Sequence, residues 1–242
     1  MANTLRTLIA ANWKMHGDQS WVFKPADFNA LFPSANRKHL DVLICPPAIL
    51  LSSMLDPEQT QVAIGGQDCH ANEKGAHTGN ISAEMLKDAG ASYVIVGHSE
   101  RRAEGDTDAD VKAKAKAAAR AGLVPIICVG ETEAERDAGK AEKVVAAQIK
   151  GSIPKIKDYV IAYEPVWAIG TGKTATPDDV DEMHNALRKL VGTKTRLLYG
   201  GSVKPANAEE LLALKNVNGA LIGGAGLEME SLAEIARLAP KP

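Results

Sequence analysis

Four polar side chains with reactive groups stand at the ends of short apolar runs. Glu164 follows the run 159–163, His98 follows the run 93–96 and one glycine, and Asn12 and Lys14 lie at the end of the run that begins at Thr7. Together they offer a base, an imidazole, an amide and a cation, which are groups used in acid–base chemistry. Each one alone has an ordinary structural reading as a capping residue, a hydrogen-bonded histidine or a solvated lysine. Their shared position after apolar runs favours a common cavity.

Two glycine pairs end later apolar runs. Gly200 and Gly201 precede Ser202, and Gly223 and Gly224 form the second pair. Without Cβ atoms the backbone can approach an anion closely and turn several N–H groups toward it, while a serine adds a hydroxyl donor. The pairs therefore indicate a phosphate site, although glycine pairs also mark tight turns.

A nucleotide-binding P-loop is a poor match to the sequence 170–174. The Walker pattern needs a glycine five places before Gly172, and Trp167 stands there. The segment therefore argues against a nucleoside triphosphatase.

The elements that would position these groups are eight apolar runs, several of which lack alternation and so predict parallel strands buried on both faces. The runs are 7–13, 41–46, 61–67, 93–98, 124–130, 159–164, 196–201 and 219–224. Eight strand and helix units in 242 residues predict an α/β fold of one domain, 1–242, built as a (β/α)8 barrel. The active site of such a barrel lies at the carboxyl ends of its strands. An open doubly wound sheet is the alternative, but the dinucleotide fingerprint that usually accompanies it is missing.

Helix signals separate the strands. Thr176 precedes Pro177 and two acids, which predicts an N-cap with proline in the first turn. Asn207 and Glu210 predict a capping box. The segments 108–121 and 131–150 also read as helices.

Composition favours a small-molecule partner. The net charge of −2 offers no strong field for nucleic acid or for a membrane surface. No run approaches the length of a membrane span, and the N-terminus lacks the regions of a secretion signal. The three cysteines, Cys45, Cys69 and Cys128, read as buried free thiols of a cytoplasmic protein.

A metal site has little support. Cys69, His70 and His77 lie close in sequence, but adjacent Cys69 and His70 are awkward joint ligands and the usual zinc spacings do not occur. We expect no metal and no cofactor.

Six motifs in family order carry a resemblance to triosephosphate isomerases. The likeness runs from residue 7 to about residue 238, and its two longest motifs are close to diagnostic. The motifs are 10–15, 93–102, 128–131, 162–173, 199–203 and 222–225.

The resemblance implies interconversion of dihydroxyacetone phosphate and D-glyceraldehyde 3-phosphate through an enediolate, without a cofactor, in glycolysis and gluconeogenesis. Glu164 would move the carbon-bound proton, His98 would polarise the carbonyl, and Asn12 and Lys14 would bind the substrate. The residues that would support them are Glu100, Ser99 and Tyr199. The residues that would bind the phosphate are Gly170, Ser202, Gly223 and Gly224.

The resemblance also assigns the segment after Glu164 to a lid over the site. Pro165 would stiffen its hinge, and the apolar tip 166–169 would exclude water. Trp167 would contact Glu131 in the open lid, and Tyr199 would hold the closed lid near Ala175.

A long loop, 67–80, would dock into a second copy of the chain, so we expect a homodimer formed around Gly75, Ala76, His77, Thr78 and Gly79. His77 stands where the family often has an aromatic residue, and Asn80 stands where a glutamate usually pairs with the arginine at Arg101. We expect Arg101 to find another acceptor. Gly226 replaces a serine that is common in the family, which would soften that turn.

Two other functions remain open from the sequence. A Schiff-base aldolase would need a desolvated lysine on an inner strand, but the sixth run ends on Glu164. A barrel kept only as a binding protein would have no need for Asn12, Lys14, His98 and Glu164 together.

Overall fold

The strands close into a barrel, as predicted. The computed structural model describes residues 5–54, 61–169 and 173–241. The strands are β1 Thr7–Asn12, β2 Leu40–Cys45, β3 Ala63–Gly66, β4 Tyr93–Val96, β5 Val124–Val129, β6 Val160–Tyr163, β7 Arg196–Tyr199 and β8 Gly219–Ile222. They follow one another around the barrel in sequence order, all neighbours are parallel, and β8 pairs with β1.

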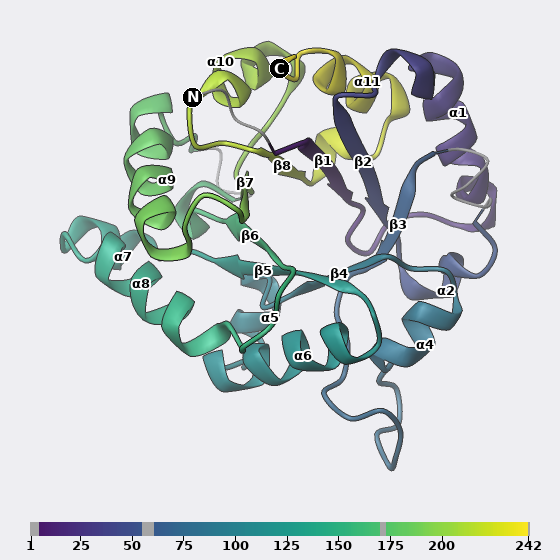
Figure 1. The fold of residues 1–242 in the computed structure, drawn as a ribbon, viewed down its shortest axis with the longest axis horizontal. Helices are drawn as coiled ribbons and strands as arrows, with labels where there is room; N and C mark the ends of the chain where they lie inside the picture. The colour runs from purple at the N-terminus through teal and green to yellow at the C-terminus, as the bar shows by residue number, and fades with distance from the viewer. Residues whose placement is uncertain (1–4, 55–60, 170–172, 242) are drawn as a thin grey trace.

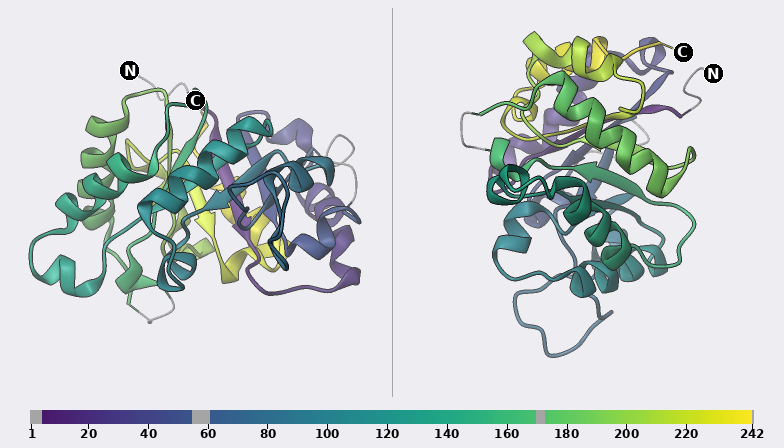
Figure 2. Two further views of the ribbon diagram at one scale, coloured as in Figure 1. Left: turned by 90° about the horizontal axis from the view of Figure 1, so that it is seen from below. Right: turned by 90° about the vertical axis from the view of Figure 1, so that its left-hand side faces the viewer.

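Helices surround the barrel, as Figures 1 and 2 show. The α-helices are α1 Lys24–Leu31, α2 Ala48–Leu51, α4 Ala83–Asp88, α5 Ser99–Ala103, α6 Asp108–Arg120, α7 Glu133–Asp137, α8 Ala141–Ser152, α9 Pro177–Val191, α10 Pro205–Ala213 and α11 Met229–Arg237. The 3-10 turns are η1 Gln19–Phe23, η2 Ser34–Asn36, η3 Val166–Ala168 and η4 Gly224–Gly226.

Both faces of the strands are buried, which explains why the apolar runs do not alternate. In β1, Leu8 and Ala10 belong to the cluster inside the barrel, whereas Ile9 and Ala11 pack toward the surrounding helices. All four side chains are fully buried. A parallel sheet covered on both sides has this pattern.

Two helix predictions were wrong in detail. Asn207 is not the N-cap of α10: the helix begins at Pro205, and the Asn207 side chain accepts a hydrogen bond from the backbone N–H of Lys204 at 2.8 Å. Proline fits the first helical position because its missing N–H would have no partner there. The segment 131–150 forms two helices, α7 and α8, because Gly139 adopts a φ of 65° between them.

The three cysteines are buried and free, as predicted. Burial raises the pKa of the Cys69 thiol to about 12, with a further contribution from the charge of Asp68. Within the described ranges, no helix has the length and apolar character needed to cross a membrane.

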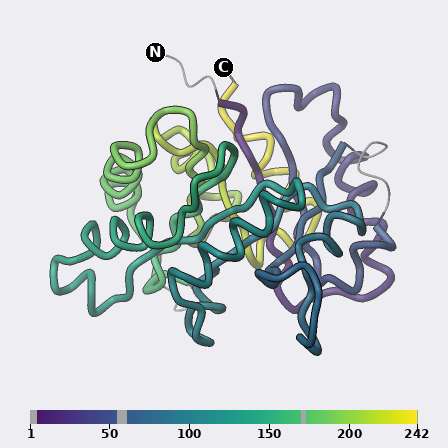
Figure 3. The backbone as a smooth tube through the Cα atoms, turned by 60° about the horizontal axis from the view of Figure 1, so that its bottom comes forward, coloured from purple at the N-terminus to yellow at the C-terminus, as the bar shows by residue number. Residues whose placement is uncertain are grey.

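The connection between β3 and α4 projects from the body of the barrel (Figures 1 and 3). At its base, the His70 N–H donates to the Ile81 carbonyl at 2.8 Å. The His70 ring also lies 3.9 Å from the His77 ring, measured between centroids. The base of the loop is thus fixed, and residues 74–76 at its tip are exposed.

Candidate active site

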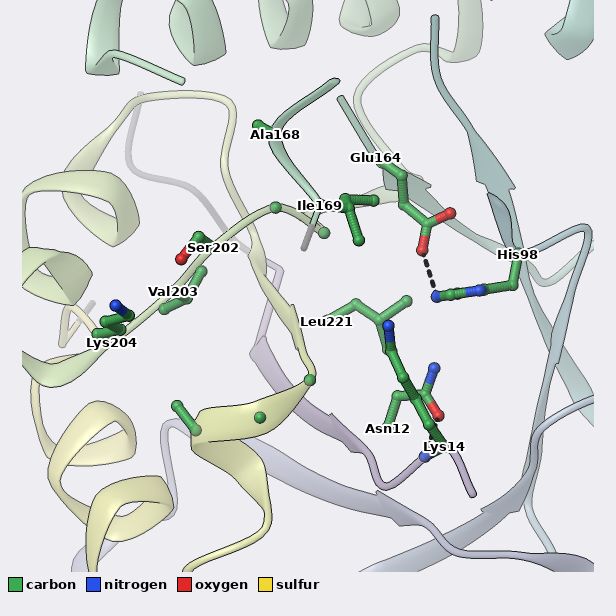
Figure 4. A pocket seen from close by; sticks show the side chains of 15 residues that line it. Asn12, Lys14, His98, Glu164, Ala168, Ile169, Ser202, Val203, Lys204 and Leu221 are labelled. Atoms are coloured by element: carbon green, nitrogen blue, oxygen red, sulfur yellow. Dashed lines mark hydrogen bonds and ion pairs between the residues drawn. The ribbon is translucent and has the colours of Figure 1, made fainter. Parts of the chain in front are cut away.

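Glu164 and His98 face each other at the carboxyl ends of β6 and β4 (Figure 4). His98 Nε2 lies 3.0 Å from Glu164 Oε1, and the backbone N–H of Ser99 donates to Glu164 Oε2 at 2.9 Å. Glu164 is 2 % exposed and His98 is 6 % exposed. The carboxylate is therefore almost fully buried and has two fixed partners.

His98 is subject to opposing influences. Burial lowers the pKa of the imidazole, but the charge of Glu164, its hydrogen bond and the charge of Glu100 outweigh burial, so the pKa is raised overall. His98 also caps α5, where Nδ1 accepts the Glu100 backbone N–H at 3.3 Å. Accepting this bond requires a free lone pair on Nδ1, which places the hydrogen on Nε2, facing Glu164.

Lys14 is held in a left-handed backbone conformation with a φ of 52°. Its N–H donates to Asn12 Oδ1 at 3.0 Å, its carbonyl accepts from Gln67 Nε2 at 2.7 Å, and its ammonium contacts Glu100 Oε1 at 2.6 Å. Non-glycine residues seldom adopt this conformation, and such strain collects at functional sites. These contacts direct Lys14 and Asn12 into the same pocket as Glu164.

Gln67 was not predicted as a functional residue from the sequence. Its Nε2 also donates to the Cys45 carbonyl at 2.9 Å, so it ties the end of β2 to the Lys14 backbone. The only available signal was its place at the end of the third apolar run.

The predicted phosphate residues line the opposite side of this pocket, whose volume is about 280 Å³. Ser202, Gly223 and Gly224 all contribute to it, as does Lys204. Gly170 lies outside the described residues. The structure thus brings the predicted catalytic residues and the described phosphate residues together around one cavity, whereas the supporting residues Ser99, Glu100 and Tyr199 lie outside its lining.

Packing alone requires glycine at both positions of the first pair, Gly200 and Gly201. A Cβ on Gly200 would lie 2.8 Å from Cγ of Glu164, and a Cβ on Gly201 would lie 2.2 Å from the Tyr199 hydroxyl. By contrast, a Cβ on Gly224 would meet no described atom within 4 Å. Gly200 therefore makes room for the Glu164 side chain at its Cγ, while Gly224 leaves open space for a ligand.

Trp167 contacts the body of the barrel in the way that the resemblance associates with an open lid. Its indole Nε1 donates to Glu131 Oε1 at 2.9 Å, and Glu131 is fully buried. The Tyr199 hydroxyl has no hydrogen-bond partner among the described residues. Burial, with a contribution from Asp179, raises the pKa of Tyr199 to about 12, which keeps this hydroxyl protonated and able to donate. The lid residues 171 and 172 lie outside the described residues.

Because Asn80 replaces the glutamate usual in the family, Arg101 was expected to find another acceptor, and the structure shows one. Arg101 donates a hydrogen bond to Glu104, and its Nε, which has no hydrogen-bond partner among the described residues, forms an ion pair with Asp68 Oδ2 at 3.4 Å. Its side chain is 42 % exposed, so the guanidinium keeps access to water.

The residues that the structure describes include no group of three or more side chains that could hold a metal ion.

The comparisons with known proteins agree with this geometry. The triosephosphate isomerase family model matches residues 7–239. The triosephosphate isomerase of Afipia carboxidovorans is 54% identical over 99% of this chain and 100% of its own length. That of Hyphomonas neptunium is 52% identical over 97% and 98%, respectively. A solved triosephosphate isomerase from Bartonella henselae superposes with a TM-score of 0.89 at 45% identity, covering 97% of this chain and 99% of its own. The chain therefore belongs to the triosephosphate isomerase family.

Proposed function

We propose how this chain, as a triosephosphate isomerase, interconverts dihydroxyacetone phosphate and D-glyceraldehyde 3-phosphate, a step of glycolysis and gluconeogenesis. Glu164 removes the proton from the carbon beside the carbonyl and returns it to the neighbouring carbon. The observation that carries this proposal is the buried contact of 3.0 Å between Glu164 and His98 in one cavity with Lys14. This arrangement puts a base beside a hydrogen-bond donor and a cation.

His98 polarises the substrate carbonyl through Nε2 and passes protons between the two oxygens. In the free protein the Glu164 carboxylate raises the pKa of His98, after burial has acted in the opposite direction. Substrate that draws Glu164 away removes the two largest influences that raise the His98 pKa, and burial, the charge of Lys14 and the Glu100 N–H then favour the neutral ring over the remaining charge of Glu100. A neutral imidazole is the form known for this enzyme family.

Lys14 and Asn12 bind the oxygen side of the substrate, and Lys14 also stabilises the charge of the enediolate. The Glu100 carboxylate keeps the Lys14 ammonium in the pocket at 2.6 Å. Ser99 supports Glu164 through its backbone N–H.

The backbone N–H groups of Gly170, Ser202 and Gly224 bind the phosphate, with Gly223 shaping the turn. The lid closes over the substrate, excludes water and prevents loss of phosphate from the enediolate, and the Tyr199 hydroxyl then bonds the closed lid near Ala175.

A coupled assay with D-glyceraldehyde 3-phosphate tests the activity directly. We expect strong turnover that withstands borohydride in the presence of substrate, because no Schiff base forms. Covalent trapping would instead indicate an aldolase, and folded protein without turnover would indicate a barrel retained only for binding.

The subunit is a single domain that forms a homodimer through the loop 67–80. Three strongly exposed apolar side chains follow the first three strands and support this arrangement: Met15 at 94%, Ile49 at 77% and Met85 at 55%. Large apolar side chains that are strongly exposed favour burial against another surface. Specific activity that falls on dilution, in step with loss of the dimer in sedimentation, would show that the dimer is required.

The enzyme acts in the cytoplasm without a metal or cofactor. The three buried free thiols suit a reducing compartment. Treatment with a chelator should leave turnover unchanged, and a loss that zinc restores would contradict this.

A further inference from the structure

The turn that carries Gly223 and Gly224 is bound from behind by residues that the mechanism does not use. Trp13 is fully buried, and its Nε1 donates to the Gly226 carbonyl at 3.2 Å. Lys24, in α1, donates through Nζ to the Leu227 carbonyl. Two carbonyls at the base of η4 thus accept bonds from side chains more than two hundred residues earlier in the chain.

The two donors are themselves connected. The Trp13 and Trp21 rings pack edge to face at 5.2 Å between centroids, and Lys24 Nζ lies 3.6 Å from the centre of the Trp21 ring. The Lys24 side chain is only 16 % exposed. Packing of this kind restricts the rotamers of both donors.

Gly226 fits this contact because β1 lies directly against it. A Cβ at Gly226 would lie 2.8 Å from the Cβ of Ala11, which is closer than two such atoms approach. Because residue 226 is glycine, the turn packs directly on β1 next to Trp13. The sequence suggested only that Gly226 would soften the turn and did not predict this contact.

Bonds within the turn carry this positioning to the phosphate side. The Gly226 N–H donates to the Gly223 carbonyl at 2.8 Å, and the Leu227 N–H donates to the Gly224 carbonyl at 3.2 Å. Because a peptide unit is planar, fixing the Gly223 carbonyl also fixes the direction of the Gly224 N–H. A displacement of the base of the turn would thus rotate the donor proposed to bind phosphate.

We propose that Trp13 and Lys24 are positioning residues for the substrate phosphate, acting as a clamp on the turn 223–227. This inference rests on the proposed function of the same pocket. Trp13 also lies between Asn12 and Lys14, so the clamp fixes the distance between the groups that hold the reacting end of the substrate and the groups that hold its phosphate. Fixed spacing of this kind raises the rate of reaction of a bound substrate.

The test compares Trp13→Phe with Trp21→Phe. Both changes remove an indole N–H from the same cluster, but within the described ranges no hydrogen bond joins the Trp21 side chain to this turn. We expect Trp13→Phe to weaken competitive inhibition by inorganic phosphate about three- to tenfold, the range for loss of one hydrogen bond, and Trp21→Phe to change it less than twofold.

Turnover of D-glyceraldehyde, which lacks phosphate, separates the clamp from damage to Asn12 and Lys14. Trp13→Phe should have the wild-type kcat/KM with glyceraldehyde but a lower kcat/KM with the triose phosphate. Equal losses with both substrates would overturn the proposal, since the effect would then reach the reacting end.

Lys24→Met provides a second test that leaves the β1 segment intact. It should raise the inhibition constant of phosphate in the same way, even if Trp13→Phe does not fold. Unchanged phosphate binding in Lys24→Met, measured also by phosphorus NMR titration, would overturn the clamp. The NMR measurement does not depend on turnover, so it distinguishes failure of the clamp from failure of the proposed activity.

Discussion

At the scale of single residues, the length of the Glu164 side chain is decisive. Glu164→Asp withdraws the carboxylate by about one methylene, and misplacement on the order of 1 Å can lower a rate by about a hundredfold. We expect kcat to fall by about this factor while KM changes little, measured in the coupled assay. Glu182→Asp, an exposed carboxylate on α9, is the control. A kcat that stays at the wild-type value in Glu164→Asp would remove Glu164 as the base.

Gly200 leads to a second prediction at this scale. Gly200→Ala would place a Cβ 2.8 Å from Cγ of Glu164, so the carboxylate must move and kcat should fall roughly ten- to a hundredfold. Gly105→Ala is the control, because its φ of 115° makes that change strained at an exposed position with no described atom within 4 Å of the new Cβ. It should lower the melting temperature and leave kcat intact. Normal kcat in Gly200→Ala would show that Glu164 tolerates the displacement.

The sequence predicted Glu164, His98, Lys14 and Asn12 as residues of one pocket because each ends an apolar run in a barrel. It could not predict Gln67, whose importance comes from a hydrogen bond to the Lys14 carbonyl across the barrel. It also could not predict the close approach of Glu164 to Gly200, which depends on the packing of β6 beside β7.

At the scale of elements, Lys114 connects α6 to the base of the projecting loop. Its ammonium lies 2.8 Å from Asp68 and 2.6 Å from Asp106, and its side chain is 11 % exposed. Lys114→Met would leave Asp106 without this cation and Asp68 with Arg101 at 3.4 Å, and removing one partner of a buried pair costs about 3 kcal/mol. We expect a lower free energy of unfolding in urea. On dilution, the specific activity should begin to fall at a higher protein concentration than in the wild type, because the loop 67–80 forms the proposed dimer contact.

Lys112→Met on the same helix serves as its control, since Lys112 is exposed. If Lys114→Met unfolds at the wild-type urea concentration, the ion pairs do not stabilise the loop.

All eight strands could be predicted because runs buried on both faces are continuous in sequence. The boundaries of helices were harder, since they depend on single backbone positions. The break between α7 and α8 at Gly139 and the start of α10 at Pro205 are two such cases.

At the scale of the whole molecule, His184 makes stability depend on pH. The side chain is fully buried, and burial, with the charge of Arg188, lowers its pKa to about 4. In the unfolded chain His184 takes up a proton near its ordinary pKa of about 6.5. The contribution of the neutral, buried His184 to the free energy of unfolding is therefore complete above pH 6.5 and is lost as pH falls toward 4. The loss from this group should be about 3 kcal/mol.

Urea unfolding of the wild type and of His184→Gln at several pH values measures this contribution. The difference in free energy of unfolding between the two proteins should shrink as pH falls from 6.5 to 4. A constant difference over that range would mean that His184 does not titrate with unfolding.

The fate of the transferred hydrogen tests the central claim most directly. We would isomerise dihydroxyacetone phosphate in deuterium oxide, trap the aldose product enzymatically, and determine its carbon-bound deuterium by NMR. If Glu164 carries the proton through an enediolate, a substantial fraction of product has deuterium at the carbon next to the aldehyde, and Glu164→Gln loses both turnover and deuterium incorporation. Product with only protium at that carbon, formed by Glu164→Gln at the wild-type rate, would indicate direct hydride transfer between the carbons and would contradict the role of Glu164 as the base.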